Sequence, residues 1–225
     1  MLVSDYDDTL TIEKEKNLKH IKKFMKKNIF VIATGRSYIS IKQRLKKEMQ
    51  GLIPNYLITN HGATIINSKN EVINTNFIEK EIVNKILTLI NKEKNRKINH
   101  YGSKKFDGKI NKIMLTFTNI DDAIGTYNKI KKTNLVNTYL INRRDKLPKV
   151  ELINKNTNKA KSIKYIEKVE NPYKIEVIGD GLQDIEMIQE YKGNCMTNAA
   201  EEVKQISKKQ YKYVYELIQE LQSNE

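Results

Sequence analysis

Two hydrophobic patterns alternate along the chain. Short runs of consecutive apolar residues, such as Ile29-Phe30-Val31-Ile32-Ala33, are typical of strands buried on both faces of a parallel sheet. Between these runs, apolar residues recur every three or four positions, which predicts helices with one buried face. The alternation of strands and helices favours an α/β fold. The expected strands are 2–4, 29–33, 56–59, 175–178 and 211–214 with a hairpin at 65–73, and the expected helices are 12–27, 38–48, one opening at 157, one behind 185 and one from 201.

The pattern changes from about Phe77 onward. Helical spacing is followed by two strand-like runs, and the same sequence of patterns then occurs a second time. The expected elements are a helix at 82–90, two strands within 97–118, a helix at 121–132, and strands at 135–141 and 149–153. This αββαββ order predicts a compact α+β insert. We therefore expect a core domain at 1–78 and 150–225 and an inserted domain at 79–149.

Composition adds limits to this architecture. A chain of 225 residues with 39% hydrophobic and 30% charged residues fits a globular protein that needs no disulfides. No stretch approaches the roughly 18 consecutive apolar residues of a membrane span, and the N-terminus does not resemble a secretory signal. The single cysteine, Cys195, excludes an internal disulfide and fits a reducing compartment. We expect a cytoplasmic protein with no membrane partner.

The net charge of +14 raises the question of nucleic-acid binding. The charge comes mostly from Lys, and Lys, Asn and Ile are frequent throughout the chain, which indicates a general compositional bias. The aromatic residues are not interleaved with the basic ones, as a base-stacking surface would require. A basic nucleic-acid-binding protein is therefore a weaker alternative, and we expect no specific nucleic-acid partner.

The first expected strand leads directly into Asp5-Tyr6-Asp7-Asp8-Thr9. Three carboxylates in four positions repel one another in a dry site, unless a cation or a protonation difference separates their roles. At the end of a strand, Asp5 and Asp7 lie near the mouth of the sheet, where one can attack phosphorus while the other handles the proton and Mg²⁺ screens the charge. The pattern indicates a phosphoryl-transfer site with an aspartate nucleophile. The alternative is an acidic surface turn.

Three later segments carry chemistry that fits the first. Thr34-Gly35 lies between a strand and a helix start, a geometry that binds anions, although Thr also serves as a simple helix cap. Lys159 lies near the positive end of a helix, where a cation is tolerated if it faces an anion, although a solvated lysine is the alternative. Asp180 and Asp184 form a second acidic turn at a strand end. The histidines show no metal-ligand spacing, so we expect no histidine metal site.

Taken together, Asp5-Tyr6-Asp7-Asp8-Thr9, Thr34, Lys159 and Asp180/Asp184 resemble the four signature segments of the haloacid dehalogenase superfamily, in order. The chain is similar to the Cof-type members with a cap inserted after the third strand. The resemblance implies a three-layer, Rossmann-like parallel sheet with an αββαββ cap, similar to the caps of archaeal-type phosphoglycolate phosphatases and sugar-phosphate phosphatases. The chain departs from the family pattern at Gln183, where Asn is usual.

The resemblance also implies a role for each matching residue. Asp5 would be the nucleophile, and Asp7 would protonate the leaving alcohol and later activate water. Thr34 and the Gly35 amide would bind phosphate oxygens, and Lys159 would neutralise charge between Asp5 and the phosphoryl group. The residues implied for a Mg²⁺ site are Asp5, Asp7 (through its carbonyl), Asp180 and Asp184, the last through water or by orienting Lys159.

The expected function is therefore Mg²⁺-dependent hydrolysis of a small phosphorylated metabolite, a sugar phosphate or phosphoglycolate, by a monomer or homodimer. A phosphomutase of the phosphomannomutase type is the nearest alternative. The cap would select the substrate. The candidate specificity residues are Arg36, His61, Lys104, Lys105, Arg143 and Arg144.

Overall fold

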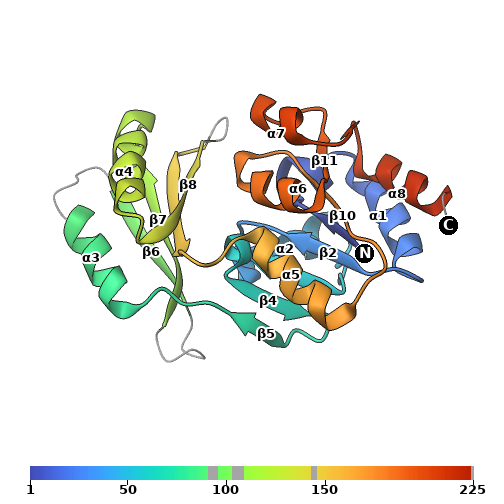
Figure 1. Ribbon diagram of the computed structural model, residues 1–225, viewed down its shortest axis with the longest axis horizontal. Helices are drawn as coiled ribbons and strands as arrows, with labels where there is room; N and C mark the ends of the chain where they lie inside the picture. Colours follow the sequence, from blue (N-terminus) through green and yellow to red (C-terminus); the bar gives the residue numbers. More distant parts are fainter. Residues whose placement is uncertain (91–95, 103–108, 143–145, 224–225) are drawn as a thin grey trace. The chain divides into compact units, whose positions relative to one another are not determined.

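The computed structural model describes residues 1–90, 96–102, 109–142 and 146–223, and the chain divides into two compact units (Figure 1). The first unit comprises residues 1–74 and 158–225, and the second comprises 75–157. The second unit begins and ends several residues outside the insert expected from the sequence. As a result, the segment 149–154, expected at the return to the core domain, is a strand of the second unit.

An eight-stranded sheet forms the centre of the first unit, and the chain has the α/β fold that its hydrophobic pattern predicts. The sheet is parallel from its first strand in spatial order to its sixth, and the next pair is antiparallel. In spatial order the strands are β12 (Gln210–Tyr211), β11 (Asn194–Met196), β10 (Glu176–Gly179), β1 (Leu2–Ser4), β2 (Phe30–Ala33), β3 (Tyr56–Thr59), β4 (Thr64–Asn67) and β5 (Val72–Thr75).

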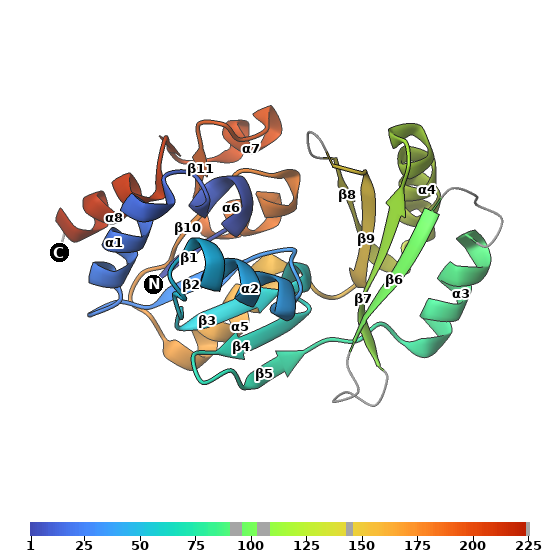
Figure 2. The same cartoon turned by 180° about the vertical axis from the view of Figure 1, so that it is seen from behind.

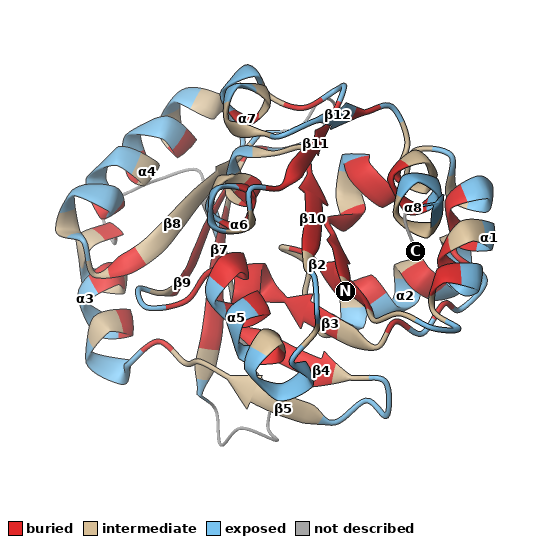
Figure 3. Ribbon diagram, turned by 45° about the vertical axis from the view of Figure 1, so that its right-hand side comes forward, coloured by how far each residue is buried: buried red, intermediate tan, exposed pale blue. Residues whose placement is uncertain are grey.

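Helices cover both faces of this sheet and complete three layers, which can be followed from opposite sides in Figures 1 and 2. One face packs against α1 (Lys14–Phe24), α2 (Tyr38–Glu48) and α8 (Val214–Ser223). The other face packs against α5 (Lys159–Glu170), α6 (Ile185–Tyr191) and α7 (Glu201–Ile206). Because both faces are covered, the central strands are buried along their length (Figure 3), as their continuous apolar runs predict.

Strand β1 lies between β10 and β2 in parallel pairing. The carboxyl ends of parallel neighbours meet at one edge of a sheet, and ligands commonly bind outside that edge. The segments that follow β1, β2, β3 and β10 therefore converge. The first of them, Tyr6–Leu10, is an irregular helical turn in which Asp8 has a positive φ of 60°, so the chain reverses sharply after Asp5.

The second unit has its own four-stranded antiparallel sheet in the order β6 (Arg96–Gly102), β7 (Ile110–Phe117), β9 (Lys149–Asn154) and β8 (Val136–Ile141). Helices α3 (Lys80–Ile90) and α4 (Ile120–Thr133) pack on apolar side chains from one face, including Ile113, Leu115 and Phe117. The chain order is thus αββαββ, as the sequence pattern predicts. Across the described ranges, no helix is long and apolar enough to cross a membrane.

Candidate active site

Asp5 is the first residue after β1, and its two carboxylate oxygens have different surroundings. Its backbone N–H donates to the carbonyl of Ile178 on β10 at 2.9 Å, which fixes the residue against the neighbouring strand. Its side chain is buried, and Oδ1 accepts a hydrogen bond from Lys159 Nζ at 2.6 Å. Oδ2 is also buried, but among the described residues it has no hydrogen-bond partner. One oxygen of Asp5 is therefore held, and the other is free to react or to bind a cation.

Lys159 is the first residue of α5, and the helix start fixes its position. Asn158 caps the helix, because its Oδ1 accepts from the backbone N–H of Lys161 at 2.8 Å. The Lys159 ammonium is buried and donates to Asp5 and to Asp184, each at 2.6 Å. Burial alone would lower the pKa of this ammonium, but the charges of Asp184 and Asp5 outweigh burial and raise its pKa above the usual value. Lys159 is therefore a fixed positive charge.

Asp184 supports the lysine and the turn that precedes it. Its Oδ1 accepts from Lys159, and its Oδ2 accepts from the backbone N–H groups of Asp180 and Gly181, each at 3.1 Å. Both oxygens are thus already occupied by donors. Gly179 leaves room for this arrangement, because a Cβ at that position would lie 2.5 Å from Asp184 Cγ. The geometry fits the role of orienting Lys159 better than direct metal coordination.

Asp180 lies at the end of β10 and is held by Thr9 from the first motif. Thr9 Oγ1 donates to Asp180 Oδ1 at 2.6 Å. Burial, reinforced by the charge of Asp184, raises the pKa of Asp180 to about 7. The sequence interpretation gave Thr9 no role, although it is a hydroxyl residue in the acidic motif and is fully buried.

Three carboxylates form a compact cluster. One oxygen from each of Asp5, Asp180 and Asp184 lies within 4.8 Å of the others, and Lys159 is the ammonium that two of them share. Burial raises the pKa of Asp5 well above its usual value; the charge of Lys159 opposes this effect, and the charges of Asp184 and Asp180 add to it. A hard divalent cation would relieve this repulsion, and carboxylate oxygens are the ligands that Mg²⁺ prefers. The unpartnered Oδ2 of Asp5 and the partly exposed Asp180 are suited to hold it.

The carboxylate of Asp7 is not part of this cluster. It forms a two-pronged ion pair with Arg36, in which Nε donates to Oδ2 at 2.8 Å and Nη2 donates to Oδ1. The sequence suggested Arg36 as a residue that selects the substrate. In the structure it pairs with Asp7, the expected acid–base residue. Arg36 also donates from Nη1 to Ser40 Oγ at 3.3 Å.

Thr34, Gly35 and His61 form a tightly packed corner after β2 and β3. Thr34 is buried, and its Oγ1 accepts from the backbone N–H of Arg36 at 3.1 Å. The backbone N–H of His61 donates to the Thr34 carbonyl at 3.1 Å. A Cβ on Gly35 would lie 2.3 Å from His61 Cε1, so the histidine ring packs directly on the glycine. His61 is itself buried, which places this specificity candidate in the wall of the corner.

The remaining specificity candidates, Lys104, Lys105, Arg143 and Arg144, lie outside the described residues. The second unit does hold one buried ion pair that the sequence interpretation did not single out. Lys112 on β7 and Glu151 on β9 are both buried, with Nζ and Oε2 separated by 3.3 Å.

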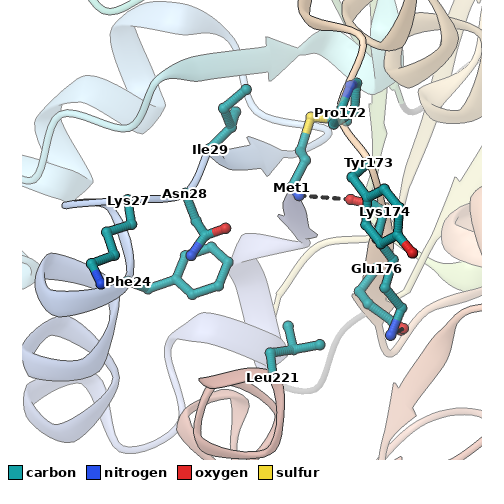
Figure 4. A pocket seen from close by; sticks show the side chains of 10 residues that line it. All are labelled: Met1, Phe24, Lys27, Asn28, Ile29, Pro172, Tyr173, Lys174, Glu176 and Leu221. Carbon is teal, nitrogen blue, oxygen red and sulfur yellow. Dashed lines mark hydrogen bonds and ion pairs between the residues drawn. The ribbon is translucent and has the colours of Figure 1, made fainter. Parts of the chain in front are cut away.

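A separate cavity of about 410 Å³ opens at the opposite edge of the large sheet (Figure 4). Its lining includes Met1, Ile29 and Glu176, which lie at the start of β1, β2 and β10, together with Phe24 and Tyr173. None of the predicted site residues lines it. The acidic cluster and this cavity are therefore at different ends of the strands.

Comparisons with known proteins identify a protein family and one relative by sequence. A family model described as haloacid dehalogenase-like hydrolase matches residues 2–106 and 91–216. An uncharacterized protein of Mycoplasma capricolum subsp. capricolum is 35% identical over 97 residues, which span 40% of this chain but only 36% of that relative.

Solved structures share the fold at low sequence identity. A putative HAD/COF-like hydrolase from Plasmodium vivax has a TM-score of 0.81 at 18% identity and covers 100% of this chain and 95% of its own. A haloacid dehalogenase-like hydrolase from B. subtilis has a TM-score of 0.80 at 15% identity, with 98% and 99% covered. A phosphatase of the same superfamily from Bacteroides thetaiotaomicron has a TM-score of 0.78 at 17% identity, with 99% and 93% covered.

Proposed function

Because the chain belongs to the haloacid dehalogenase-like hydrolase family, we propose that it is a Mg²⁺-dependent phosphatase acting on a small phosphorylated metabolite, a sugar phosphate or phosphoglycolate. The observation that carries the proposal is the asymmetry of Asp5. Oδ1 is held by the Lys159 ammonium at 2.6 Å, while the buried Oδ2 has no partner among the described residues. A carboxylate in this state is both positioned and available as a nucleophile.

In the proposed reaction, Oδ2 of Asp5 attacks the phosphorus atom, and the bond from phosphorus to the alcohol oxygen breaks. Asp7 gives a proton to the departing alcohol, which leaves an aspartyl-phosphate on Asp5. Asp7 then accepts a proton from a water molecule as that water attacks the same phosphorus. The bond from phosphorus to Asp5 Oδ2 breaks, inorganic phosphate leaves, and the Asp5 carboxylate is regenerated.

The charges around Asp5 suit this chemistry. Phosphoryl transfer spreads negative charge over the three equatorial oxygens, and positioned cations and N–H donors stabilise it. Lys159 supplies a buried ammonium beside the nucleophile. Thr34 and the Gly35 amide, in the segment that follows β2, are the proposed phosphate-binding donors. Asp5 and Asp180 would hold Mg²⁺, with the carbonyl of Asp7, and the ion would neutralise charge on the phosphoryl oxygens.

The test is a panel of phosphorylated sugars, phosphoglycolate and other small monoesters, assayed with Mg²⁺ and with excess chelator. We expect Mg²⁺-dependent phosphate release from at least one compound and no release in chelator. The variant D5N should lose at least about a thousandfold in kcat, because an amide does not attack phosphorus. The matched control is D8N, which changes an exposed neighbouring acid whose positive φ suits Asn and should stay within about twofold of wild type.

Three outcomes would contradict the proposal. Full activity in chelator would exclude the metal-dependent mechanism, and a tenth of wild-type activity in D5N would exclude Asp5 as nucleophile. Turnover that depends on a bisphosphate activator, with little phosphate released, would identify a phosphomutase instead.

A further inference from the structure

The guanidinium of Arg36 holds both carboxylate oxygens of Asp7. Nε donates to Oδ2 at 2.8 Å, and Nη2 donates to Oδ1, so the two planar groups meet in the fork geometry that only arginine provides. The side chains are 19% and 13% exposed, which makes this a largely buried pair. An exposed ion pair contributes little to the stability of the fold. When a buried ion pair loses one partner, the remaining charge stays buried without compensation.

The protein fixes Arg36 at both ends. Its backbone N–H donates to Thr34 Oγ1 at 3.1 Å, and its carbonyl accepts from the backbone N–H of Asn60 at 2.8 Å. At the far end, Nη1 donates to Ser40 Oγ on the first turn of α2 at 3.3 Å. The guanidinium position is therefore set by the loop that follows β2, and not by Asp7 alone.

The backbone that carries Asp7 is irregular. Asp7 lies in the turn after β1, in extended backbone with φ of −76° and ψ of 133°, directly before the left-handed Asp8. A carboxylate on such a turn can rotate about two side-chain bonds unless something holds it. Proton transfer requires the donor and acceptor atoms within about 3 Å, and a displacement of about 1 Å can reduce a rate roughly a hundredfold.

We propose that Arg36 is the positioning residue for Asp7: it fixes the orientation of the carboxylate that moves the proton in the reaction. This inference rests on the proposed phosphatase function. It assigns Arg36 to the acid–base step, whereas the sequence suggested a role in choosing the substrate. A residue with this role changes kcat through Asp7 and has little effect on which substrate binds.

The expected effect of R36Q is a loss of about ten- to a hundredfold in kcat, with KM within about threefold of wild type. R36K should be impaired to a similar degree, because an ammonium keeps the charge but does not supply two parallel N–H donors. The matched control is R44Q, which removes a guanidinium from α2, the helix that follows Arg36 in the chain; Arg44 pairs with Glu48, and this variant should retain wild-type kcat.

A double-mutant cycle separates action through Asp7 from action on the substrate. If Arg36 works through Asp7, adding R36Q to D7N should lower kcat by no more than about twofold beyond D7N alone, so the two losses are not additive. Additive losses would show that Arg36 acts independently of Asp7 and would overturn the inference. Wild-type kcat in R36Q would overturn it as well.

A crystal structure of R36Q gives a readout that does not depend on turnover. We expect the Asp7 carboxylate to occupy one orientation in the wild-type protein and to be displaced, or to take several orientations, in R36Q. An unmoved Asp7 in R36Q would overturn the inference even if the enzyme is a phosphatase. Absence of phosphatase activity in the wild-type protein would instead contradict the proposed function, and the structural comparison would still decide whether Arg36 positions Asp7.

Discussion

Lys159 is the residue on which the electrostatics of the acidic cluster depends. It is only 1% exposed and lies between Asp5 and Asp184, so its charge is desolvated and compensated by both. Removal of one member of a buried charge group leaves the others uncompensated, and this is far more destabilising than the loss of a surface pair. The lysine thus contributes to folding as well as to the proposed chemistry.

We predict that K159M lowers the free energy of unfolding by about 3–5 kcal/mol at pH 7 and abolishes turnover. Methionine has a similar length but no charge, so packing is largely kept. The matched control is K161M, because Lys161 is exposed in the same turn and its loss should change stability by less than about 0.5 kcal/mol. Chemical denaturation of both variants tests this, and equal stability of the two would contradict it.

The raised pKa of Asp180 predicts how stability depends on pH in the metal-free protein. The folded state holds a proton on Asp180 up to about pH 7, whereas the unfolded state releases it near the ordinary value of 3.8. Because the folded state binds more protons in this window, the free energy of unfolding should fall as the pH rises from about 4 to about 7. The raised pKa of Asp5 acts in the same direction.

Excess Mg²⁺ should flatten or reverse this slope, because a divalent cation binds the ionised carboxylates and binds more strongly as they lose protons. D180N is the control. In this variant the pH dependence of the metal-free protein should be smaller, and added Mg²⁺ should change the stability less. Denaturation curves at several pH values, with and without Mg²⁺, provide the measurement. If the free energy of unfolding without metal instead rises with pH, and does so equally in D180N, that result would contradict the raised pKa of Asp180.

At the scale of elements, the site depends on close approach between a strand end and the turn that follows it. Asp184 reaches its position only because Gly179, the last residue of β10, has no side chain. The Gly35–His61 contact between the segments after β2 and β3 is of the same kind. These glycines are needed for space, and not for an unusual backbone angle.

We predict opposite effects for alanine at two glycines. G179A should destabilise the protein by about 1–3 kcal/mol, because its Cβ would displace the Asp184 carboxylate, and should also reduce turnover. G125A lies inside α4 with nothing within 4 Å of the new Cβ, and it should stabilise by up to about 1 kcal/mol. Thermal unfolding and kinetics of the two variants provide the comparison. A neutral G179A would show that the turn can shift to accommodate a methyl group.

For the whole molecule, the +14 charge predicts weak and purely electrostatic attraction to nucleic acid. Affinity for any short duplex should fall at least about a hundredfold between about 50 and about 200 mM salt, and should not depend on sequence. The variant K22E/K23E reverses two exposed charges on α1 and should bind the same duplex more weakly than the wild-type protein. Fluorescence anisotropy with two unrelated duplexes is the assay, and a tight, sequence-dependent complex at about 200 mM salt would restore the nucleic-acid alternative.

Patterns local in sequence account for most of the fold. The continuous apolar run Ile29 to Ala33 predicts a strand buried on both faces, and helices cover both faces of this strand in the structure. The proximity of Asp5 and Asp180 follows from parallel strands whose ends share an edge, although their separation in the chain is large.

The contacts that the sequence did not predict depend on side-chain orientation. The Asp7–Arg36 pair requires the irregular turn at Asp8, which no periodic pattern indicates. Asn17 is a second example. Its Nδ2 donates to the carbonyls of Leu10 and Ile12, and its Oδ1 accepts from the backbone N–H of Tyr215, so one buried amide joins segments far apart in the chain.

The order of strands in the large sheet has a consequence for synthesis of the protein. The ribosome produces β1 to β5 first, and these can pair among themselves, but the partner on the other side of β1 is β10, at residues 176–179. Until that strand emerges, β1 has an open hydrogen-bonding edge, which is a template for pairing with another nascent chain. Lys159 and Asp180 also emerge only after the second unit. A chain interrupted before β10 therefore carries an unprotected sheet edge and an Asp5 that lacks Asp180.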